Sequence, residues 1–565
     1  MVVEQPAAPS SLAPAVPRAP VRAGWLGAIW QREWLVVLLL AGWATFLFGW
    51  RLTTPGVYIY DEVYHAYTGD LMQQNDPAVY EWWMSAPQEP IKGVQYEWTH
   101  PPLGKLIIGG SIKVFGNNSL GWRFSNALFG VICTVLMYLF ARTLFRDRLL
   151  ATLAAFVITI EGLMFAESRI GTNDIFQLAF LLAAYTCFSR FFHLPARKAI
   201  GWLFLTGIFL GLGLATKWPS IYSIVLLAGV AAVRGFWPTR RSRRLPSSAR
   251  TREGIPTSGP EVVDAEWRAL DSTGVDAGQG SAATLALSDG AAYLATRARL
   301  AYAAAGSPST PEQLEANNAP ERWGFFGRAG YLISAGIALL LIPAGEYVLS
   351  YLQMFLQPHQ IAAGYDGVGP FNLGPIHLPA YTLPDSSWRS MFLGEQWQMW
   401  HYHTTLTAGH PYYSKPWQWL LDIRPVFYYV DRHDTWVANT YNLGNPLLYW
   451  FFPLAIVASV VFIIKRRDLA LLLVLGAFLI NWAVWSASPR GMFFYHFLPS
   501  VPFCVLMVVY GLTRMYRSGS RWLSRLATTY LVIIIVSFAF FYPQLAAFPQ
   551  PNWYADIHFW LPSWE

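Results

Sequence analysis

Long apolar runs recur along this chain of 565 residues, and they constrain its fold more than any other feature. The first run extends from Trp34 to Trp50 and contains no charged residue. A helix needs about 20 apolar residues to cross a bilayer. Only 13% of the residues are charged, whereas soluble proteins carry about 25%. The sequence therefore predicts an all-α polytopic membrane protein.

We expect eleven transmembrane helices. They lie at roughly 33–50, 121–144, 149–167, 174–193, 199–216, 218–236, 328–350, 444–464, 468–487, 496–513 and 526–543. If the N-terminus is cytoplasmic, alternation of sides brings the basic clusters between the spans to the cytoplasmic face, as the positive-inside rule requires. These clusters are Arg146 with Arg148, Arg197 with Lys198, and the stretches 240–244, 465–468 and 514–521. They explain the net charge of +7 without a nucleic-acid partner.

The segments between the spans predict how the chain is organised. We expect a disordered cytoplasmic tail at 1–32, an N-terminal transmembrane module at 33–239 with an external loop at 51–120, a mostly disordered cytoplasmic insert at 240–325, a C-terminal module at 326–543 with a large external loop at 351–443, and an extracytoplasmic tail at 544–565. The insert is rich in Ala, Ser, Gly and Pro, which is typical of disorder. The external loops are rich in Trp and Tyr, which indicates folded contact surfaces where a site is expected.

The first external loop begins with two adjacent carboxylates, Asp61 and Glu62, in the stretch "YIYDEVYHA". Adjacent side chains on a helix point about 100° apart, so the two acids cannot face one point equally. One can accept a proton while the other orients a partner. An Asp-Glu pair at a helix end is also common as a solvated or dipole-related acid. Both interpretations stay open on this stretch alone.

Further polar residues gather at the external ends of the spans. "HPPLGK" contains His100 and Lys105, although Pro-Pro is also an ordinary helix start. The others are Arg123, Glu167, Arg169, Asn173, Asp174 and Lys217. They are either interfacial charges that form ion pairs with one another, for example Arg169 with Asp174, or ligands for an anion such as a lipid phosphate, which arginine binds well.

The late external loop contains His401, His403 and His410 among many aromatic residues. A zinc site is disfavoured because no Cys joins them and their spacing matches no usual ligand pattern. A surface that binds a sugar or a phosphate fits better. Another outer turn, "SPRGMFFYHFLPS", adds Arg490, Tyr495 and His496. The sequence lacks a Walker loop, HExxH and GxSxG, which disfavours a nucleotide-driven pump or a soluble-type hydrolase.

Several motifs together resemble the protein O-mannosyltransferase family, which consists of membrane glycosyltransferases of the GT-C class (glycosyltransferase family 39). The motifs are "YIYDEVYHA", "YEWTHPPLGKLIIGG", "GWRFSNALFG", "ESRIGTNDIF", "GLATKWPSIY", "MWHYHTTLTAGHPYYSKPWQWLLDIRPVFYY" and "RGMFFYHFLPSVPF". The chain lacks the MIR domain of eukaryotic members, and the insert at 240–325 is not part of the family pattern. The resemblance therefore indicates a prokaryotic member with a GT-C fold.

This resemblance implies an inverting transfer of mannose from polyprenyl- or dolichyl-phosphate-mannose to Ser or Thr hydroxyls of exported proteins. It implies Asp61 as the catalytic base and Glu62 as a supporting or acceptor-contacting residue. Residues expected to bind the donor phosphate or sugar are Arg51, His100, Lys105, Arg123, Lys217, His403 and Arg424, and those expected to support the acceptor or the structure are Arg169, Asp174, His410 and Trp417. No metal ligand is assigned.

The expected location is a prokaryotic plasma membrane, with the active site on the extracytoplasmic face. Expected partners are the lipid-linked donor, the exported acceptor protein and the secretion translocon. Two alternatives remain. One is a related lipid-phosphosugar transferase that acts on a lipid or glycan, of the lipid A aminoarabinose type. The other is a non-enzymatic lipid or solute transporter, which the lack of internal duplication disfavours.

Overall fold

The computed structural model describes residues 32–194, 196–236, 325–359, 367–373, 376–382, 388–406 and 409–565. Its contacts divide the chain into two units, and the fold below is that of the unit formed by Met1–Ala232 and Tyr331–Glu565. The predicted tail at 1–32 and insert at 240–325 lie outside the described residues, except for Arg32 and Phe325. Their predicted disorder therefore stays a prediction.

Eight helical spans in the described residues are long and apolar enough to cross a membrane. They are α5 (Ser119–Phe145), α8 (Asp174–His193), α9 (Ala196–Thr216), α14 (Phe325–Gly336) with η2 (Ile337–Leu341) and α15 (Ile342–Ser350), α19 (Pro446–Tyr449) with α20 (Phe452–Arg466), α21 (Leu469–Trp482) with η3 (Ala483–Ala487), η4 (Phe494–Ser500) with α22 (Val501–Tyr516), and α23 (Arg521–Leu545). Three shorter apolar helices are α2 (Glu33–Gly49), α6 (Arg148–Thr159) and α10 (Ser220–Phe236). Each of these eleven matches a predicted span, and the chain is an integral membrane protein.

One predicted span, at 149–167, is interrupted. Helix α6 ends at Thr159, and α7 (Gly162–Glu167) starts again after Glu161. The Glu161 carboxylate accepts hydrogen bonds from the backbone N–H groups of Leu163 and Met164, at 2.9 and 2.7 Å. A buried acid thus caps the new helix and satisfies amides that would otherwise lack partners.

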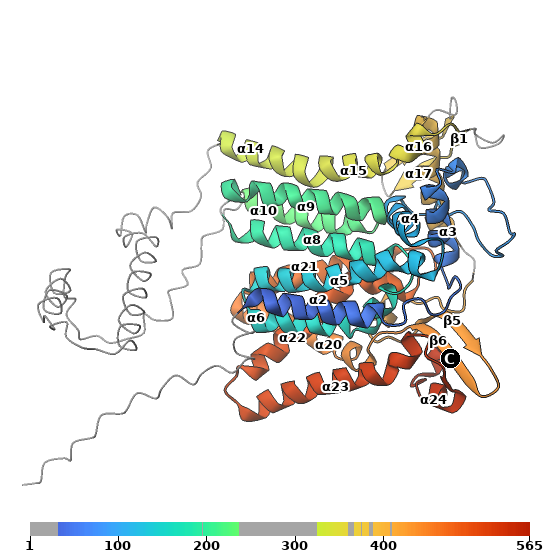
Figure 1. Cartoon of the computed structure of the whole chain (residues 1–565). Helices are drawn as coiled ribbons and strands as arrows, with labels where there is room; N and C mark the ends of the chain where they lie inside the picture. Colours follow the sequence, from blue (N-terminus) through green and yellow to red (C-terminus); the bar gives the residue numbers. More distant parts are fainter. Residues whose placement is uncertain are drawn as a thin grey trace, which may run out of the picture. The chain divides into compact units, whose positions relative to one another are not determined.

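The spans differ in how deeply they are buried. In the most apolar window of each span, 78% of residues are buried in α8 and 94% in the η4–α22 span, against 22% in the α19–α20 span. Helix α8 contacts both α5 and α9, and Figure 1 shows these helices side by side. The loop elements gather at one end of the long helices (Figure 1).

The first long loop, which is predicted to be external, folds into α3 (Glu62–Gln73), η1 (Pro77–Tyr80) and α4 (Leu103–Phe115). Helices α3 and α4 pack backbone to backbone at Gly69 and Gly109. A Cβ atom at Gly69 would lie 2.8 Å from the carbonyl oxygen of Lys105, and one at Gly109 would lie 2.4 Å from that of Gly69. This close approach needs glycine at both positions, and it positions Lys105 beside α3.

The second long loop, which is also predicted to be external, contains helices and strands. They are α16 (Leu352–Leu356), β1 (Gly367–Val368), β2 (Phe371–Leu373), β3 (Ile376–Leu378), β4 (Tyr381–Thr382), α17 (Trp388–Thr405), α18 (Pro416–Trp419), β5 (Val426–Arg432) and β6 (Trp436–Asn442). The C-terminal tail adds β7 (Gln550–Pro551), α24 (Asn552–Asp556) and η5 (Pro562–Trp564). Strands β5, β6 and β7 form one antiparallel sheet. The helical membrane fold is as predicted, and this small sheet was not predicted.

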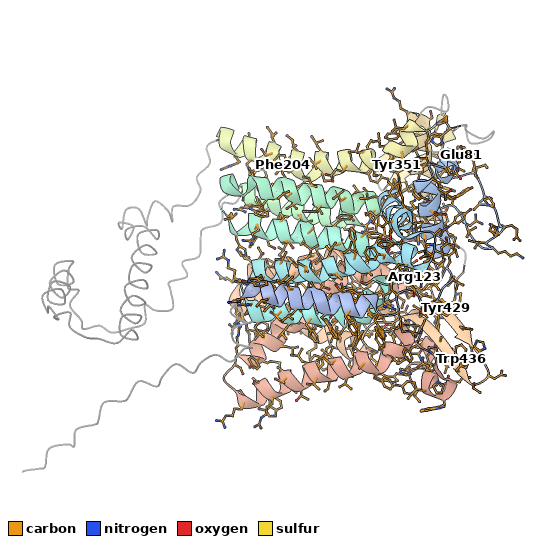
Figure 2. All side chains as sticks on the ribbon, in the orientation of Figure 1. Glu81, Arg123, Phe204, Tyr351, Tyr429 and Trp436 are labelled. Carbon is orange, nitrogen blue, oxygen red and sulfur yellow. The ribbon has the colours of Figure 1, made fainter. Side chains whose placement is uncertain are left out.

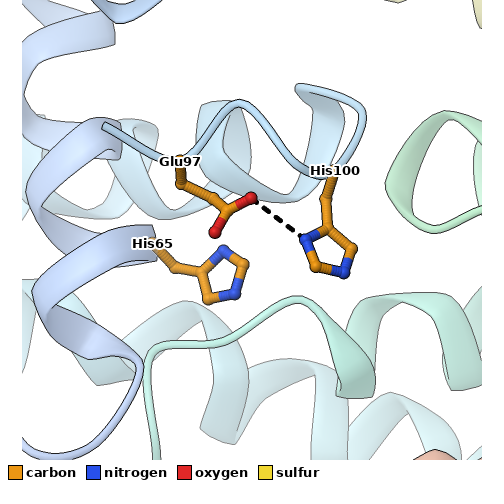
Figure 3. Close-up of side chains that lie close together, drawn as sticks. All are labelled: His65, Glu97 and His100. Atoms are coloured by element: carbon orange, nitrogen blue, oxygen red, sulfur yellow. Dashed lines mark hydrogen bonds and ion pairs between the residues drawn. The ribbon is translucent and has the colours of Figure 1, made fainter. Parts of the chain in front are cut away.

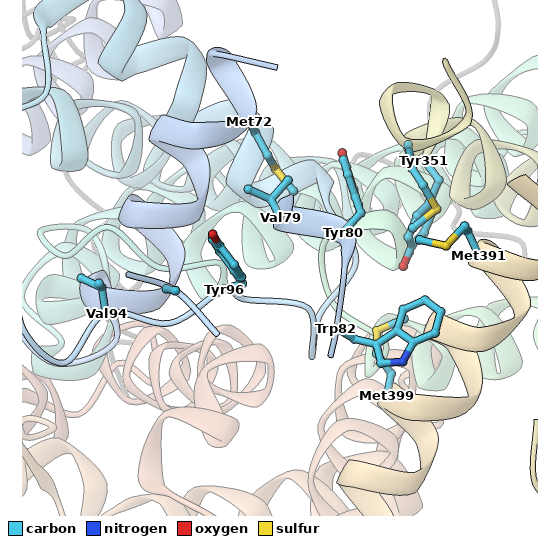
Figure 4. Close-up of a cluster of buried hydrophobic side chains, with 11 residues drawn as sticks. Met72, Val79, Tyr80, Trp82, Val94, Tyr96, Tyr351, Met391 and Met399 are labelled. Atoms are coloured by element: carbon cyan, nitrogen blue, oxygen red, sulfur yellow. The ribbon is translucent and has the colours of Figure 1, made fainter. Parts of the chain in front are cut away.

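A shared hydrophobic core joins the two long loops (Figure 4). The first loop contributes Met72, Val79, Tyr80, Trp82, Ala86, Val94 and Tyr96, and the second loop together with the end of α15 contributes Tyr351, Met354, Met391 and Met399. The Tyr80 hydroxyl also donates to Gln353 at 3.0 Å. Both loops are folded, as predicted, and they fold against each other.

Candidate active site

Asp61 lies where the extended chain turns into α3. Tyr60, just before it, has a positive φ of 44°, and its ring stacks on Tyr428 with centroids 4.4 Å apart. The Asp61 backbone carbonyl accepts the amides of Tyr64 and His65, but its half-buried carboxylate does not cap the helix. Among the described residues, no group donates a hydrogen bond to this carboxylate. It is therefore an available acceptor.

The surroundings of Asp61 make it a weaker acid. Its pKa is raised to about 7, first by loss of solvation and then by the negative charges of Glu97 and Asp174, while Lys217 and Arg490 oppose the shift. A general base works best when its pKa lies near the operating pH. Perturbed carboxylates of this kind are candidates for functional groups. Asp61 can thus accept a proton from an alcohol near neutral pH.

Glu62, the next residue, has an entirely different environment. Its side chain is fully buried and forms an ion pair with Arg123, whose Nε and Nη2 donate to Oε1 and Oε2 at 2.7 and 2.8 Å. The same carboxylate accepts the backbone amides of Ile59 and Gly171, both at 2.9 Å. Both carboxylate oxygens of Glu62 therefore have donors within the protein, and its contact with an acceptor stays a prediction.

Arg123 is equally occupied. Besides Glu62, its guanidinium donates to the carbonyl oxygens of Leu52, Pro55 and Val57 at 3.2, 2.7 and 2.9 Å. An arginine has five N–H donors, and all five have acceptors here. Figure 2 shows Arg123 at the loop end of α5. Its donors hold the start of the first loop in place, and its role as a phosphate ligand stays a prediction.

Lys217 and Asp174 form a second buried ion pair. The Lys217 ammonium donates to both carboxylate oxygens of Asp174 at 2.7 and 2.9 Å, and it lies 5.2 Å from the centre of the Tyr495 ring. The expected pair of Asp174 with Arg169 does not form. Arg169 instead donates to the backbone carbonyls of residues 48, 50 and 51, so it fixes the end of the first transmembrane helix.

The turn before α4 carries Glu97, His100 and Lys105. The Glu97 carboxylate lies 3.0 Å from Nδ1 of His100. Lys105 is buried, and its ammonium donates to the backbone carbonyls of Glu97 and of His100. Lys105 therefore braces the turn, and its binding of the donor phosphate stays a prediction. The turn presents Glu97 toward His65 on α3, as Figure 3 shows.

His403 and Arg490 approach this turn from the C-terminal module. Nε2 of His403 pairs with the Thr99 carbonyl at 2.8 Å, and its Nδ1 meets Nη1 of Arg490. A carbonyl accepts and a guanidinium donates, so His403 is protonated on Nε2 alone and is neutral. Burial, with His100 and Arg490 nearby, lowers its pKa to about 3. His403 thus positions Arg490.

Arg490 is the cation that the sequence analysis noted without assigning to the site. It is half-buried, and its positive charge lowers the pKa of Asp61. It has no carboxylate partner among the described residues. Its guanidinium therefore keeps donors for an anion. The available signal is its position in a turn that is predicted to be external, on the side where basic residues are uncommon.

Four predicted residues do not join these groups. Arg51 donates to the Ala547 carbonyl and stacks on Phe548. Arg424 donates to the Pro411 carbonyl. His410 accepts from the Tyr412 amide, and Trp417 is 55% exposed. Within the described residues, none of the four shares a hydrogen bond with Asp61, Lys217, His403 or Arg490.

One group of side chains at the site could hold a metal ion. Ligand atoms of His65, Glu97 and His100 lie within 4.8 Å of one another, and Figure 3 shows the Glu97 carboxylate between the two rings. Burial lowers the pKa of His65 to about 3. For Glu97, burial raises the pKa, but the opposing effects of His100, His65 and Lys105 leave it well below its usual value. Neutral imidazole and ionised carboxylate are the forms that bind metals.

The fold and these groups define a membrane glycosyltransferase of the GT-C class. A protein O-mannosyltransferase complex of Saccharomyces cerevisiae, solved with its sugar donor bound, shares the fold with a TM-score of 0.64 at 14% identity, over 94% of this chain and 93% of that one. Polyprenol-phosphate-mannose–protein mannosyltransferases of Mycolicibacterium smegmatis and Mycobacterium tuberculosis are 27% and 26% identical over 94% of this chain and 92% of theirs.

Two family descriptions match long parts of the chain. "Dolichyl-phosphate-mannose-protein mannosyltransferase" matches residues 40–248, and "C-terminal four TMM region of protein-O-mannosyltransferase" matches residues 388–564. Together they cover most of the two membrane modules and contain Asp61, His100, Lys217, His403 and Arg490. The chain belongs to the protein O-mannosyltransferase family.

Proposed function

We propose that this protein transfers mannose from polyprenyl-phosphate-mannose to Ser or Thr hydroxyl groups of exported proteins. The observation that carries the proposal is the unpaired carboxylate of Asp61, which lies among cations at the loop end of a membrane-helix bundle. The curated mycobacterial relatives are named for this activity, and the similarity to them extends over 92% of their length. A base at the membrane edge is accessible to a sugar that is carried by a membrane lipid.

The reaction requires one base and a stabilised leaving group. Asp61 accepts the proton of the acceptor hydroxyl as the hydroxyl oxygen attacks C1 of the mannose. The bond between C1 and the phosphate oxygen breaks with its electron pair, and C1 is inverted. The leaving polyprenyl phosphate already carries negative charge, so cations can stabilise it without a general acid.

Arg490 is the strongest candidate for the phosphate. Its guanidinium has no carboxylate partner in the part of the chain that the structure describes, and His403 contacts its Nη1. Lys217 uses donors on Asp174 at 2.7 and 2.9 Å, and an ammonium group has three donors, so one is left. Nε2 of His100 is the third candidate, since Glu97 holds the other ring nitrogen. Lys217, His100 and His403 thus keep their predicted place near the donor phosphate, with His403 acting through Arg490.

The extracytoplasmic location of the site is part of the proposal. The turn from α5 to α6 contains Arg146 and Arg148, and the end of α20 contains Lys465 and Arg466. Arg521 starts α23 in another basic turn. Basic turns of this kind mark the cytoplasmic side, and Asp61 belongs to the loops between the other helix ends. Association with the secretion translocon stays a prediction.

The test is transfer by the purified enzyme with defined substrates. Asp61→Asn is expected to lower the rate with polyprenyl-phosphate-mannose and a Ser/Thr peptide by about 10²–10⁴-fold. Asp70→Asn on the same helix is the matched control, because within the described parts of the chain Asp70 bonds only Gln73 and Asn117. Normal turnover by Asp61→Asn would contradict the base assignment. Transfer to lipid A or a glycan in place of the peptide would favour the related lipid-phosphosugar transferase.

A further inference from the structure

We propose that His65, Glu97 and His100 form a binding site for one divalent transition-metal ion of the zinc type. Two imidazoles and one carboxylate make a donor set that Zn²⁺ favours in sites with three protein ligands and one open position. Hard ions such as Mg²⁺ and Ca²⁺ prefer sites built from oxygen atoms alone. The site is distinct from the Arg490 and Lys217 groups, and it does not depend on the proposed transfer reaction.

The distances of the three side chains fit a single ion. Their ligand atoms lie within 4.8 Å of one another, and Oε1 of Glu97 is 3.0 Å from Nδ1 of His100. Metal–nitrogen bonds of about 2.0–2.1 Å place two tetrahedral ligands about 3.4 Å apart. The Glu97–His100 pair is therefore already close to ligand spacing, and the remaining distances, at most 4.8 Å, need to shorten by no more than about 1.4 Å.

An unsatisfied atom supports the same conclusion independently. His65 is 4% exposed, and its Nδ1 has no hydrogen-bond partner among the described residues. A buried polar atom without a partner costs about 1–3 kcal/mol. Figure 3 shows the His65 ring next to the free oxygen of Glu97. A metal ion shared by these groups would satisfy the orphaned nitrogen.

The backbone around the site is held rigidly. The Glu97 amide donates to the Thr68 hydroxyl on α3 at 2.8 Å, which places Glu97 next to the turn that carries His65. The Lys105 ammonium donates to the backbone carbonyl of His100 at 2.7 Å and to that of Glu97. The Thr99 hydroxyl donates to the Glu97 carboxylate at 2.5 Å. Such outer contacts orient metal ligands and raise affinity.

The experiment measures metal binding without donor or acceptor. The full-length protein in detergent is freed of metal with a chelator and titrated with Co²⁺ and Zn²⁺. We expect one ion per chain. Glu97→Gln and His65→Ala should each weaken binding by about 100-fold, since even the loss of an outer-shell partner costs about 10–100-fold. His401→Ala is the matched control, because His401 is exposed and stacks on Trp397.

Two results would overturn the site. One is a wild-type protein without stoichiometric binding, and the other is unchanged affinity in both variants. X-ray absorption of the wild-type Zn²⁺ complex gives a second measurement that does not need folded variants: two imidazoles in the first shell support the site, and fewer refute it. Because no sugar transfer is involved, a failed mannosyltransferase assay leaves this result unaffected, and the reverse also holds.

Discussion

The surroundings of Asp61 and Glu62, which are adjacent in the sequence, differ in how their charges are balanced. The Glu62 region is closed: its carboxylate and the Arg123 guanidinium are 0% and 1% exposed, with every donor of Arg123 used. The Asp61 region is open, since its carboxylate has no hydrogen-bond donor among the described residues and faces cations without bonding them. The Glu62–Arg123 pair holds the loop in place, and the Asp61 carboxylate remains available to accept a proton.

The largest effect should come from breaking the closed region. Arg123→Ala leaves Glu62 buried without its partner, which should lower the free energy of unfolding by about 3–5 kcal/mol. Arg142→Ala is the matched control, because the Arg142–Glu33 pair is partly exposed and such pairs contribute about 0–1 kcal/mol. Denaturation of the detergent-solubilised variants measures both. Equal stability of the two would show that the closed pair is not structural.

In the open region, removal of a cation should affect catalysis and leave stability nearly unchanged. Arg490→Ala is expected to lower the rate of transfer by about 10²–10³-fold, the loss seen when one donor to a developing charge is removed. The unfolding midpoint should stay close to that of the wild type, because Arg490 is half-buried and has no carboxylate partner in the described chain. A variant that unfolds early would instead place Arg490 with the structural charges.

The pH dependence of the rate should report the open acid. Asp61 must be ionised to accept a proton, and its pKa is raised to about 7. The rate should therefore rise as the pH increases through about 7 and level off above it. Glu97→Gln removes a negative charge that raises this pKa, so the midpoint should move to lower pH when both proteins are assayed with a chelator. An unchanged midpoint would argue against Asp61 as the titrating base.

The smallest effect is expected at Arg424, which the sequence analysis placed with the phosphate ligands. In the structure, its Nε donates to the Pro411 carbonyl at 2.8 Å. Arg424→Ala should change the transfer rate less than about threefold and cost only about 0.5–1.5 kcal/mol of stability for the lost hydrogen bond. A loss comparable to that of Arg490→Ala would restore Arg424 to the site.

The membrane fold was predictable because each span is a local signal: about 20 apolar residues bounded by charges. Asp61 was predictable from its motif and its position beside the first span. The partner of Glu62 was not, because Arg123 lies 61 positions further along and only the fold brings the two together. Nothing local shows that Lys105 turns inward to backbone carbonyls, since any outer lysine could equally reach a phosphate.

The antiparallel sheet was missed for a related reason. Strands β5 and β6 have the sequences "VFYYVDR" and "WVANTYN". Their aromatic residues indicate a contact surface of the loop. Some of these aromatic residues do form contacts with other segments, since Tyr428 donates to Glu167 and stacks on Tyr60. Pairing of β6 with β7 joins residues 436 and 551, a contact that no local pattern predicts.

The site also has a consequence for how the polypeptide can be divided. Asp61, His100 and Lys217 precede residue 237, whereas His403 and Arg490 follow residue 324, so neither part of the chain holds both the base and the free guanidinium. The buried contact between their loops, from Tyr80 to Gln353 and through the shared methionine and tyrosine core, supplies a surface for reassembly. Two fragments separated between these positions should each be inert alone and recover transfer when they are produced together.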